Sequence, residues 1–386
     1  MPRLSNALIS RAYGISPLLP LVLRGSRELP SAINELRWLR EHVRSENRSR
    51  DTRLLNQKLL GLCRRRANGE PLQYLLGTQP FGELEIKCRP GVLIPRPETE
   101  AYTTHLAEAL LSQHGNGPLE PKANQNSLES LNVVDFCTGT GCIALLTGSL
   151  LSERFPRVNV VGVDISPHAL ALANENLAHN LKDLNPNKAS PRISFEAGNL
   201  FSDLKHPSFH SLSPDVVISN PPYISEKGFN TETTRSVRTW EPKLALVPAI
   251  TPERLGCAPE DIFYQELLKT YSTQKSRMML LEIGDSDQAM RVAKLAVKIG
   301  GDCKVQIWRD WPDQEAPPEA PSVVRIEVQD GSKGSLIRRD ILVKGLGKAR
   351  SVLVLWGSYI DLLHPPHADG TDPPESLDWE TTWETD

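Results

Sequence analysis

From residue 131 onward, short apolar runs alternate with stretches whose apolar residues recur at helical spacing. The runs have the length of buried strands, and a segment long enough for a helix separates most of them. Seven strands are expected, with the sequences LNVVDF, VNVVGVD, RISFEAG, PDVVIS, RMMLLEIG, KVQIW and VVRIEV. Strands that alternate with helices form a parallel, doubly wound sheet. Residues 131–330 are therefore predicted to be one α/β domain.

The first 69 residues show a helical pattern without strands. One predicted helix presents an apolar face from Ile33 to Val43, and its Trp38 is expected in the core. A second helix has apolar residues at 55, 59 and 62, begins at Asp51 as N-cap and ends at Asn68-Gly69. Residues 1–69 are predicted to be a small helical domain.

Charge is spread unevenly along the chain. Residues 1–66 hold 14 Lys and Arg against 5 Asp and Glu, whereas residues 361–386 hold 8 acidic residues and no Lys or Arg. The first 27 residues contain four arginines, several serines and no acid, which is typical of a mitochondrial transit peptide. A basic first helix of the folded domain explains this composition equally well.

Several segments fall outside the two predicted domains. Residues 113–130 are polar and rich in Gly, Pro, Asn and Ser, which indicates a flexible loop. Residues 331–363 are expected to form a C-terminal extension with one late strand at 351–356, and residues 364–386 an acidic disordered tail. The apolar runs are shorter than the roughly 20 residues that span a bilayer. The six cysteines lack CxxC pairs and zinc-like His spacing, so reduced thiols in an intracellular protein and no metal site are expected.

The first candidate for chemistry is the segment 135–142 (DFCTGTGC), between a predicted strand and the helical run 143–151. Glycines at 139 and 141 let backbone amides at a helix N-terminus approach a ligand closely. Gly139, Gly141 and Ala144 satisfy the dinucleotide pattern GxGxxG/A. Asp164 ends the next strand, where it can accept hydrogen bonds from ribose hydroxyls. The pattern predicts an adenosine-containing cofactor and fits both NAD and S-adenosylmethionine.

The second candidate is Ser219-Asn220-Pro221-Pro222-Tyr223, at the end of the strand PDVVIS. Open α/β sheets bind ligands at this edge. The prolines lack N–H groups and fix φ, so nearby carbonyl oxygens have no N–H donor within the segment and remain available as acceptors. The Asn220 side-chain oxygen and the Pro221 carbonyl can accept both hydrogens of a planar NH2 group, while the Tyr223 ring packs on its flat face.

This arrangement favours methyl transfer to nitrogen. An amide or aromatic amine nitrogen is a poor nucleophile because its lone pair is delocalised. Two hydrogen bonds to fixed acceptors return electron density to the nitrogen and aim its lone pair at a sulfonium methyl group. The expected cofactor is S-adenosylmethionine, and the expected catalytic residues are Asn220, Pro221, Pro222 and Tyr223. A dehydrogenase is disfavoured because no His or Lys is positioned near the predicted cleft.

With these residues the chain resembles the class I S-adenosylmethionine-dependent methyltransferases, and more narrowly the HemK/PrmC-type glutamine methyltransferases of peptide chain release factors. The narrower resemblance rests on residues 70–77 (EPLQYLLG), 81–82 (FG), 90–100 (PGVLIPRPETE), 241–246 (EPKLAL) and 281–284 (LEIG). It implies a Rossmann-like doubly wound catalytic domain and a helical N-terminal domain. Residues 70–112 would form a β-hairpin linker and a leading helix.

The resemblance also implies roles for individual residues. The residues 220–223 would bind the substrate glutamine, and Asn220 would also lie near the cofactor. Asp164 would contact the ribose, and Asn199 and Leu200 would lie on the adenine side. The methionine and ribose contacts would be made by Cys137, Thr138, Gly139, Thr140 and Gly141. Three positions depart from the family pattern. Cys137 replaces a usual Gly and avoids strain only at negative φ, Asn199 replaces a usual Asp, and Leu200 offers no aromatic ring.

Family substrates are the GGQ-loop glutamines of release factors, so a release factor is the expected partner of a monomeric enzyme, with methylation at N5. Bacterial and organellar members have the helical domain that cytosolic eukaryotic ones generally lack. The resemblance therefore implies the mitochondrial matrix, with the cytoplasm as the alternative.

Three other functions stay open. An adenine-N6 nucleic-acid methyltransferase would use the same pocket, although no nucleic-acid-binding motif is recognisable and no direct nucleic-acid substrate is expected. A ribosomal-protein glutamine methyltransferase would use the same chemistry. The third possibility is a non-catalytic binding partner, for which Cys137 is the one hint.

Overall fold

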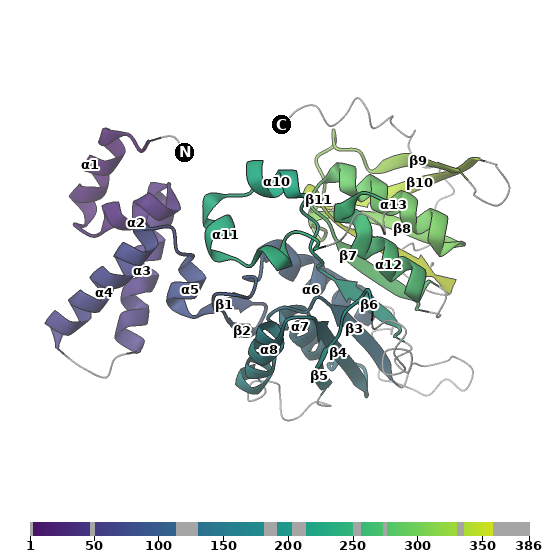
Figure 1. The fold of residues 1–386 in the computed structure, drawn as a ribbon, viewed down its shortest axis with the longest axis horizontal. Coiled ribbons are helices and arrows are strands. Elements are labelled where there is room, and N and C mark those ends of the chain that lie inside the picture. Colours follow the sequence, from purple (N-terminus) through teal and green to yellow (C-terminus); the bar gives the residue numbers. More distant parts are fainter. Residues whose placement is uncertain are drawn as a thin grey trace. The chain divides into compact units, whose positions relative to one another are not determined.

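The computed structural model describes residues 3–46, 51–112, 130–180, 191–202, 214–249, 256–272, 276–329 and 336–357 (Figure 1). The expected loop at 113–130, apart from Ser130, and the acidic tail at 364–386 lie outside these residues. The chain divides into two compact units. The first comprises Met1–Gln79, Ile86–Ile94 and Lys227–Lys243, and the second comprises Pro80–Glu85, Pro95–Glu226 and Leu244–Asp386. The first unit thus includes a segment that follows the predicted Asn220–Tyr223 motif.

The first unit is helical. Its helices are α1 (Asn6–Ile15), α2 (Leu19–Ser26), α3 (Leu29–Ser45), α4 (Thr52–Ala67), α5 (Leu72–Leu76) and α11 (Arg235–Trp240), with α10 (Glu226–Thr231) beginning at its boundary. The predicted caps of α4 are confirmed, because the Asp51 side chain accepts from the Arg53 N–H and Asn68 is the C-cap. The predicted face of α3 is partly wrong. Ile33 and Trp38 are 40% and 41% exposed, and Ala32 is buried in the core instead.

The first 27 residues contribute to the core of this unit. Ala12, Leu19, Val22 and Leu23 are fully buried, in one cluster with Leu36 and Leu39 of α3. Helices α1 and α2 agree with the interpretation as basic helices of the folded domain, and the transit segment stays a prediction. Their apolar side chains are packed as core residues.

A buried ion pair joins α3 to α4. The Arg66 guanidinium donates to both oxygens of Glu35, at 2.7 Å and 3.1 Å. Helix α2 approaches this arginine at Gly25, where a Cβ atom would lie 2.6 Å from the Arg66 carbonyl oxygen. A glycine is therefore needed for α2 to pack against α4.

The second unit is built on a mixed nine-stranded sheet of order β5-β4-β3-β6-β7-β11-β8-β10-β9. Its strands are β3 (Leu131–Phe136), β4 (Val158–Asp164), β5 (Arg192–Ala197), β6 (Val216–Ser219), β7 (Met278–Glu282), β8 (Cys303–Trp311), β9 (Val323–Gln329), β10 (Leu336–Lys344) and β11 (Leu346–Trp356). The strands β5, β4, β3, β6 and β7 pair in parallel. This confirms the predicted α/β fold.

The remaining strands differ from the expected parallel continuation. Strand β11 lies between β7 and β8 and is antiparallel to both, while β10 is parallel to β8 and antiparallel to β9. Strands β10 and β11, which the sequence assigned to an extension, thus belong to the sheet, and the expected late strand at 351–356 is the end of β11. The apolar residues at the end of β11 are fully buried in the sheet. A central position removes these side chains from water, which explains why so apolar a strand lies there. Three consecutive charged residues of β10, Arg338, Arg339 and Asp340, interrupt the apolar pattern and hid its strand character.

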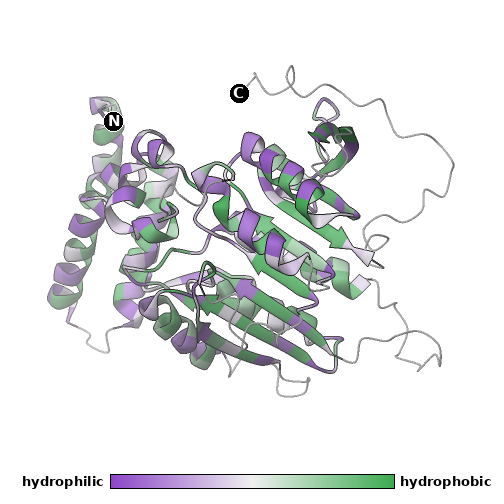
Figure 2. Ribbon diagram, turned by 45° about the vertical axis from the view of Figure 1, so that its right-hand side comes forward, coloured by the Kyte–Doolittle hydropathy of each residue, from purple (hydrophilic) through white to green (hydrophobic). Residues whose placement is uncertain are grey.

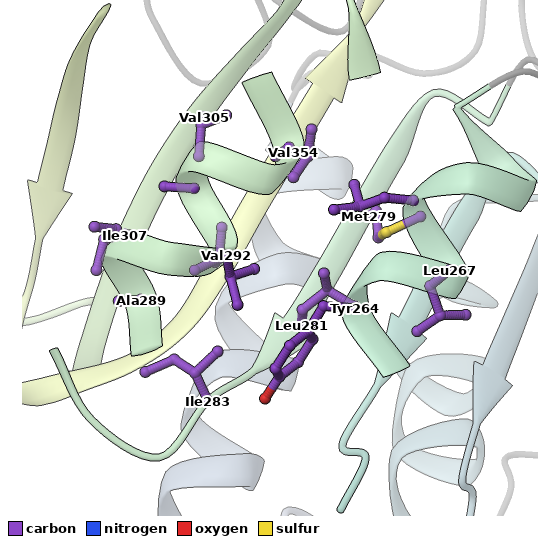
Figure 3. Packing of buried hydrophobic residues seen from close by; sticks show 14 of the residues in the cluster. Tyr264, Leu267, Met279, Leu281, Ile283, Ala289, Val292, Val305, Ile307 and Val354 are labelled. Atoms are coloured by element: carbon purple, nitrogen blue, oxygen red, sulfur yellow. The ribbon is translucent and has the colours of Figure 1, made fainter. Parts of the chain in front are cut away.

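Helices cover both faces of this sheet (Figure 2). They are α6 (Pro97–Ser112), α7 (Cys142–Leu151), α8 (Pro167–Asn180), α12 (Ile262–Tyr271) and α13 (Ser286–Gly300), with 3-10 turns at Lys243–Ala245 and Pro259–Asp261. Helices α12 and α13 pack on β7, β8 and β11 through residues such as Leu267, Val292 and Leu281 (Figure 3). The predicted Ser166-Pro167 start of α8 is confirmed, with the Ser166 hydroxyl accepting from the Ala169 N–H.

A separate two-stranded sheet, β1 (Thr78–Phe81) and β2 (Leu84–Lys87), is the hairpin that the resemblance led us to expect. Within the described ranges, no helix is both long enough and apolar enough to cross a membrane.

The burial of α2 generates a stability prediction. Leu23 is fully buried, so Leu23→Ala is expected to destabilise the helical unit by about 2–5 kcal/mol. Ile15 is 56% exposed, and Ile15→Ala is the control, with an expected change of less than about 1 kcal/mol. Urea unfolding combined with hydrogen exchange of α3 and α4 amides measures both. Equal, small effects would contradict the placement of α2 in the core.

Candidate active site

Strand register brings the residues predicted from sequence to one edge of the sheet. Ser219 of β6 pairs with Phe136 of β3 and with Leu281 of β7, and Phe136 pairs with Val163 of β4. The next residues along these strands therefore form one row in the order Asp164, Cys137, Asn220 and Glu282. Neighbouring strands lie about 4.8 Å apart. The glycine loop and the Asn220 segment are thus adjacent.

The loop of residues 137–141 is braced by its surroundings. The Gly139 N–H donates to Asp164 Oδ2 at 2.9 Å, and Asn176 Nδ2 of α8 donates to the Thr140 carbonyl at 2.9 Å. The residues Thr138 and Thr140 are both 3% exposed. The loop therefore has a fixed backbone conformation within the protein itself.

Two glycines explain the shape of this loop. Gly141 has φ +80°, and a Cβ atom there would lie 2.7 Å from the Phe195 ring, so close packing of the loop requires glycine. Gly139 has φ +56°, and its Cβ position meets only the Cys137 carbonyl, at 3.9 Å. The open space beside Gly139 would be filled by a larger side chain. A ligand can approach the backbone there, so the loop fits the expected cofactor.

Cys137 does not have the negative φ that would keep this position free of strain. Its φ is +61°, in the left-handed region that favours glycine, so its Cβ atom is strained. Burial raises the pKa of the Cys137 thiol well above its usual value, and the nearby charges of Asp164 and Asp135 act in the same direction. The thiol is therefore neutral, which disfavours a role as a nucleophile.

Two carboxyl groups flank the loop. Asp164 accepts from the N–H groups of Gly139 and Ser166, at 2.9 Å and 2.8 Å, and a carboxylate has a further acceptor position that a ribose hydroxyl could use. Burial raises the pKa of Asp164. Asp135 is fully buried and accepts from the Thr138 hydroxyl at 2.5 Å, and burial raises its pKa to about 7.

The segment after β5 uses its side chains locally. Asn199 Oδ1 accepts from the Phe201 N–H at 2.9 Å, which closes a turn. Leu200 is 7% exposed and belongs to the hydrophobic core, so only its backbone is available to a ligand. The Phe201 ring packs against Phe263, with ring centroids 4.8 Å apart.

Residues 220–223 follow β6 directly. Pro221 and Pro222 are buried, whereas Asn220 and Tyr223 are partly exposed. Within the described part of the chain, no residue hydrogen bonds with the Asn220 amide. Its acceptor oxygen is therefore available to a planar NH2 group.

Sequence reasoning assigned no role to Glu282 and Gln288, which both contact Tyr223. Glu282 Oε1 accepts from the Tyr223 hydroxyl at 3.1 Å, and Gln288 Nε2 donates to the Tyr223 carbonyl at 3.2 Å. The sequence held one signal for a role of Glu282, which is a carboxylate at the end of the otherwise apolar strand MMLLE. Among the described residues, no group of three His, Cys, Asp or Glu side chains could hold a metal ion.

Known proteins resemble this chain in sequence. Residues 121–239 match the methyltransferase small domain family. The mitochondrial MRF1 N(5)-glutamine methyltransferase MTQ1 of Saccharomyces cerevisiae is 34% identical over 75% of this chain and 78% of its own length. A probable MRF1 mitochondrial N(5)-glutamine methyltransferase of Schizosaccharomyces pombe is 32% identical over 64% and 73%. A release factor glutamine methyltransferase of Koribacter versatilis is 36% identical over 47% and 53%.

The left-handed conformation of Cys137 predicts the effect of a glycine. Cys137→Gly relieves strain of about 1 kcal/mol but loses part of the thiol's packing, so stability is expected to stay equal or to rise by up to about 1 kcal/mol. Cys142→Gly, in the first turn of α7, is the control and should destabilise by about 1 kcal/mol or more. Thermal unfolding distinguishes the two, and similar losses of stability in both would contradict the strain at Cys137.

Asp135 predicts a pH dependence of stability. Its pKa is about 7 in the folded protein and 3.8 ordinarily, so the folded state keeps a proton that the unfolded chain releases. Between pH ~4 and pH ~7, this group lowers the free energy of unfolding as pH rises, by about 1.4 kcal/mol per pH unit. Asp135→Asn cannot ionise, so its stability relative to wild type should rise by about 2–3 kcal/mol from pH 5 to pH 8.

Urea unfolding at several pH values measures this difference. Asp287→Asn removes an exposed carboxyl on α13 and serves as the control. A difference between Asp135→Asn and wild type that stays constant with pH would refute the prediction.

Proposed function

The chain belongs to the family of release factor N5-glutamine methyltransferases, and we propose that it methylates the side-chain amide nitrogen of the GGQ-loop glutamine of a release factor. It is an S-adenosylmethionine-dependent enzyme. The observation that carries the proposal is the row of strand ends, in which the partly exposed Asn220 stands beside the glycine loop. A nucleophile held by one strand end would face a cofactor held by the next.

We propose the cofactor contacts as follows. Backbone amides of residues 137–141 and the open face of Gly139 would hold the methionine and ribose side, and Asp164 would accept from the ribose hydroxyls. Asn199 and the backbone of Leu200 would line the adenine side. S-adenosylmethionine supplies the electrophilic methyl carbon when bound.

The pocket's own residues would activate the substrate. The Asn220 side-chain oxygen and the Pro221 carbonyl would each accept one hydrogen of the glutamine amide, and the Tyr223 ring would pack on its flat face. As the N–C bond forms, the bond from the methyl carbon to sulfur would break and S-adenosylhomocysteine would leave. Positive charge then develops on the nitrogen and makes its N–H groups better donors, so these hydrogen bonds are stronger in the transition state than in the ground state. The nitrogen then loses one proton to water, and the pocket needs no general base.

The relatives support a cellular setting for this reaction. The two yeast proteins are named for the mitochondrial release factor MRF1, which supports a mitochondrial release factor as substrate and the mitochondrial matrix as location. We propose that the enzyme acts as a monomer, because one chain supplies every residue of the row.

A methyl-transfer assay tests the proposal. Purified protein is incubated with radiolabelled S-adenosylmethionine and either a release factor that carries the GGQ loop or duplex DNA. Label on the GGQ glutamine is expected. Label on adenine, or none on the release factor, would reject the proposed substrate.

Asn220→Ala is expected to lower kcat by about 10²–10³-fold while the Kd for cofactor changes little, because it removes one acceptor of the substrate amide. Asp164→Ala should weaken cofactor binding instead. Asn174→Ala, an exposed asparagine on α8, is the matched control and should resemble wild type. Full activity of Asn220→Ala would contradict its role.

A further inference from the structure

Glu282 is a buried carboxyl group at the end of the row. It is 2% exposed, and it follows the fully buried residues MMLL of β7. Burial raises its pKa, because the charged form loses its hydration there. Glu282 Oε2 accepts from the Thr99 hydroxyl at 2.6 Å, and Oε1 accepts from the Tyr223 hydroxyl at 3.1 Å. Its two oxygens thus link the start of α6 to Tyr223.

Tyr223 is held from three sides. Its hydroxyl donates to Glu282, its carbonyl accepts from Gln288 Nε2, and its ring lies against Gly284, where a Cβ atom would be 3.1 Å from Cδ2. Gln288 is itself fixed, because it accepts from the Gly284 N–H at 2.8 Å and donates to Asp261 at 3.0 Å. The tyrosine therefore has little freedom to turn.

The position of Tyr223 determines the position of the proposed acceptors. Pro221 and Pro222 fix their φ angles, so the short segment from Asn220 to Tyr223 moves as a stiff piece. A shift of about 1 Å in a reacting group can cost about 10²-fold in rate. A bond that holds Tyr223 also holds the Pro221 carbonyl and Asn220.

We propose that Glu282 is a positioning residue for methyl transfer. By accepting the Tyr223 hydroxyl on one oxygen and the Thr99 hydroxyl on the other, it orients residues 220–223 toward the substrate amide. Glu282 touches neither substrate nor cofactor in this role. The inference rests on the proposed function. It adds a residue of β7 that, through its bond to Thr99 of α6, holds the pocket residues 220–223 in place.

A double-mutant cycle tests this inference. Glu282→Gln keeps the size of the side chain but replaces one acceptor oxygen by a donor NH2 group. It should lower kcat about 10–100-fold and leave the cofactor Kd unchanged. Tyr223→Phe removes the hydroxyl from the other side of the bond. Glu282→Gln leaves one acceptor oxygen for the two hydroxyls of Thr99 and Tyr223, so it weakens the linkage that Tyr223→Phe breaks. The double variant should therefore be slower than wild type by less than the product of the two single effects.

Ser351→Ala is the matched control. Ser351 pairs with Glu282 across β7 and β11, is fully buried, and its hydroxyl has no partner among the described residues. This variant should keep the wild-type kcat. Multiplying effects of Glu282→Gln and Tyr223→Phe, or a wild-type kcat in Glu282→Gln, would overturn the inference.

A second measurement does not depend on the substrate. Hydrogen exchange at the Tyr223 and Ile224 amides should be faster in Glu282→Gln and in Tyr223→Phe, and unchanged in Ser351→Ala. Unchanged exchange in the first two variants would overturn the positioning role even where wild-type protein methylates a release factor. Faster exchange without methylation of a release factor by wild-type protein would reject only the proposed function.

Discussion

Parallel pairing of β4, β3, β6 and β7 is the constraint on which the candidate site depends. In-register pairing forces four consecutive strands of the sheet to end at the same level, so Asp164, Cys137, Asn220 and Glu282 stand side by side. Neighbours in this row are far apart in the sequence, because at least one complete connection between strands separates them. A register shift of one residue would turn each of these side chains to the opposite face of the sheet.

The same edge concentrates buried carboxyl groups. Asp135 and Glu282 are at most 2% exposed, and burial raises the pKa of both and of Asp164. Each accepts from donors of the protein, which are hydroxyls for Asp135 and Glu282 and backbone N–H groups for Asp164, although Asp135 Oδ1 has no partner among the described residues. Such groups weaken the fold when a donor is lost. Their presence at the carboxyl edge fits a site that is shaped before its ligands arrive.

The chain passes through both units after residues 220–223. After residues 220–223 and the start of α10, the chain enters the helical unit over Lys227–Lys243 and then returns to the α/β unit. In the helical unit, Trp240 packs with Tyr74, Cys88 and Ile94, and the Ile94 N–H donates to Glu241. The sequence motif EPKLAL is therefore explained in part by packing in the helical unit rather than by chemistry.

Local patterns in the sequence predicted helices α3, α4, α7 and α8, the parallel strands and the two motifs, because burial of one face leaves a period in the chain itself. They also located Asp51, Asn68 and Ser166 at helix ends, where the side-chain oxygens of Asp51 and Ser166 accept from N–H groups of their own helices and the Asn68 backbone N–H donates to the last turn of α4. Pairing partners that lie far apart leave no such period. Only the tertiary structure decided that β11 enters the centre of the sheet, that Cys137 is left-handed, and that Glu282 joins Thr99, 183 residues away, to Tyr223. These features depend on which strands and helices meet, and that choice is made by packing the whole unit.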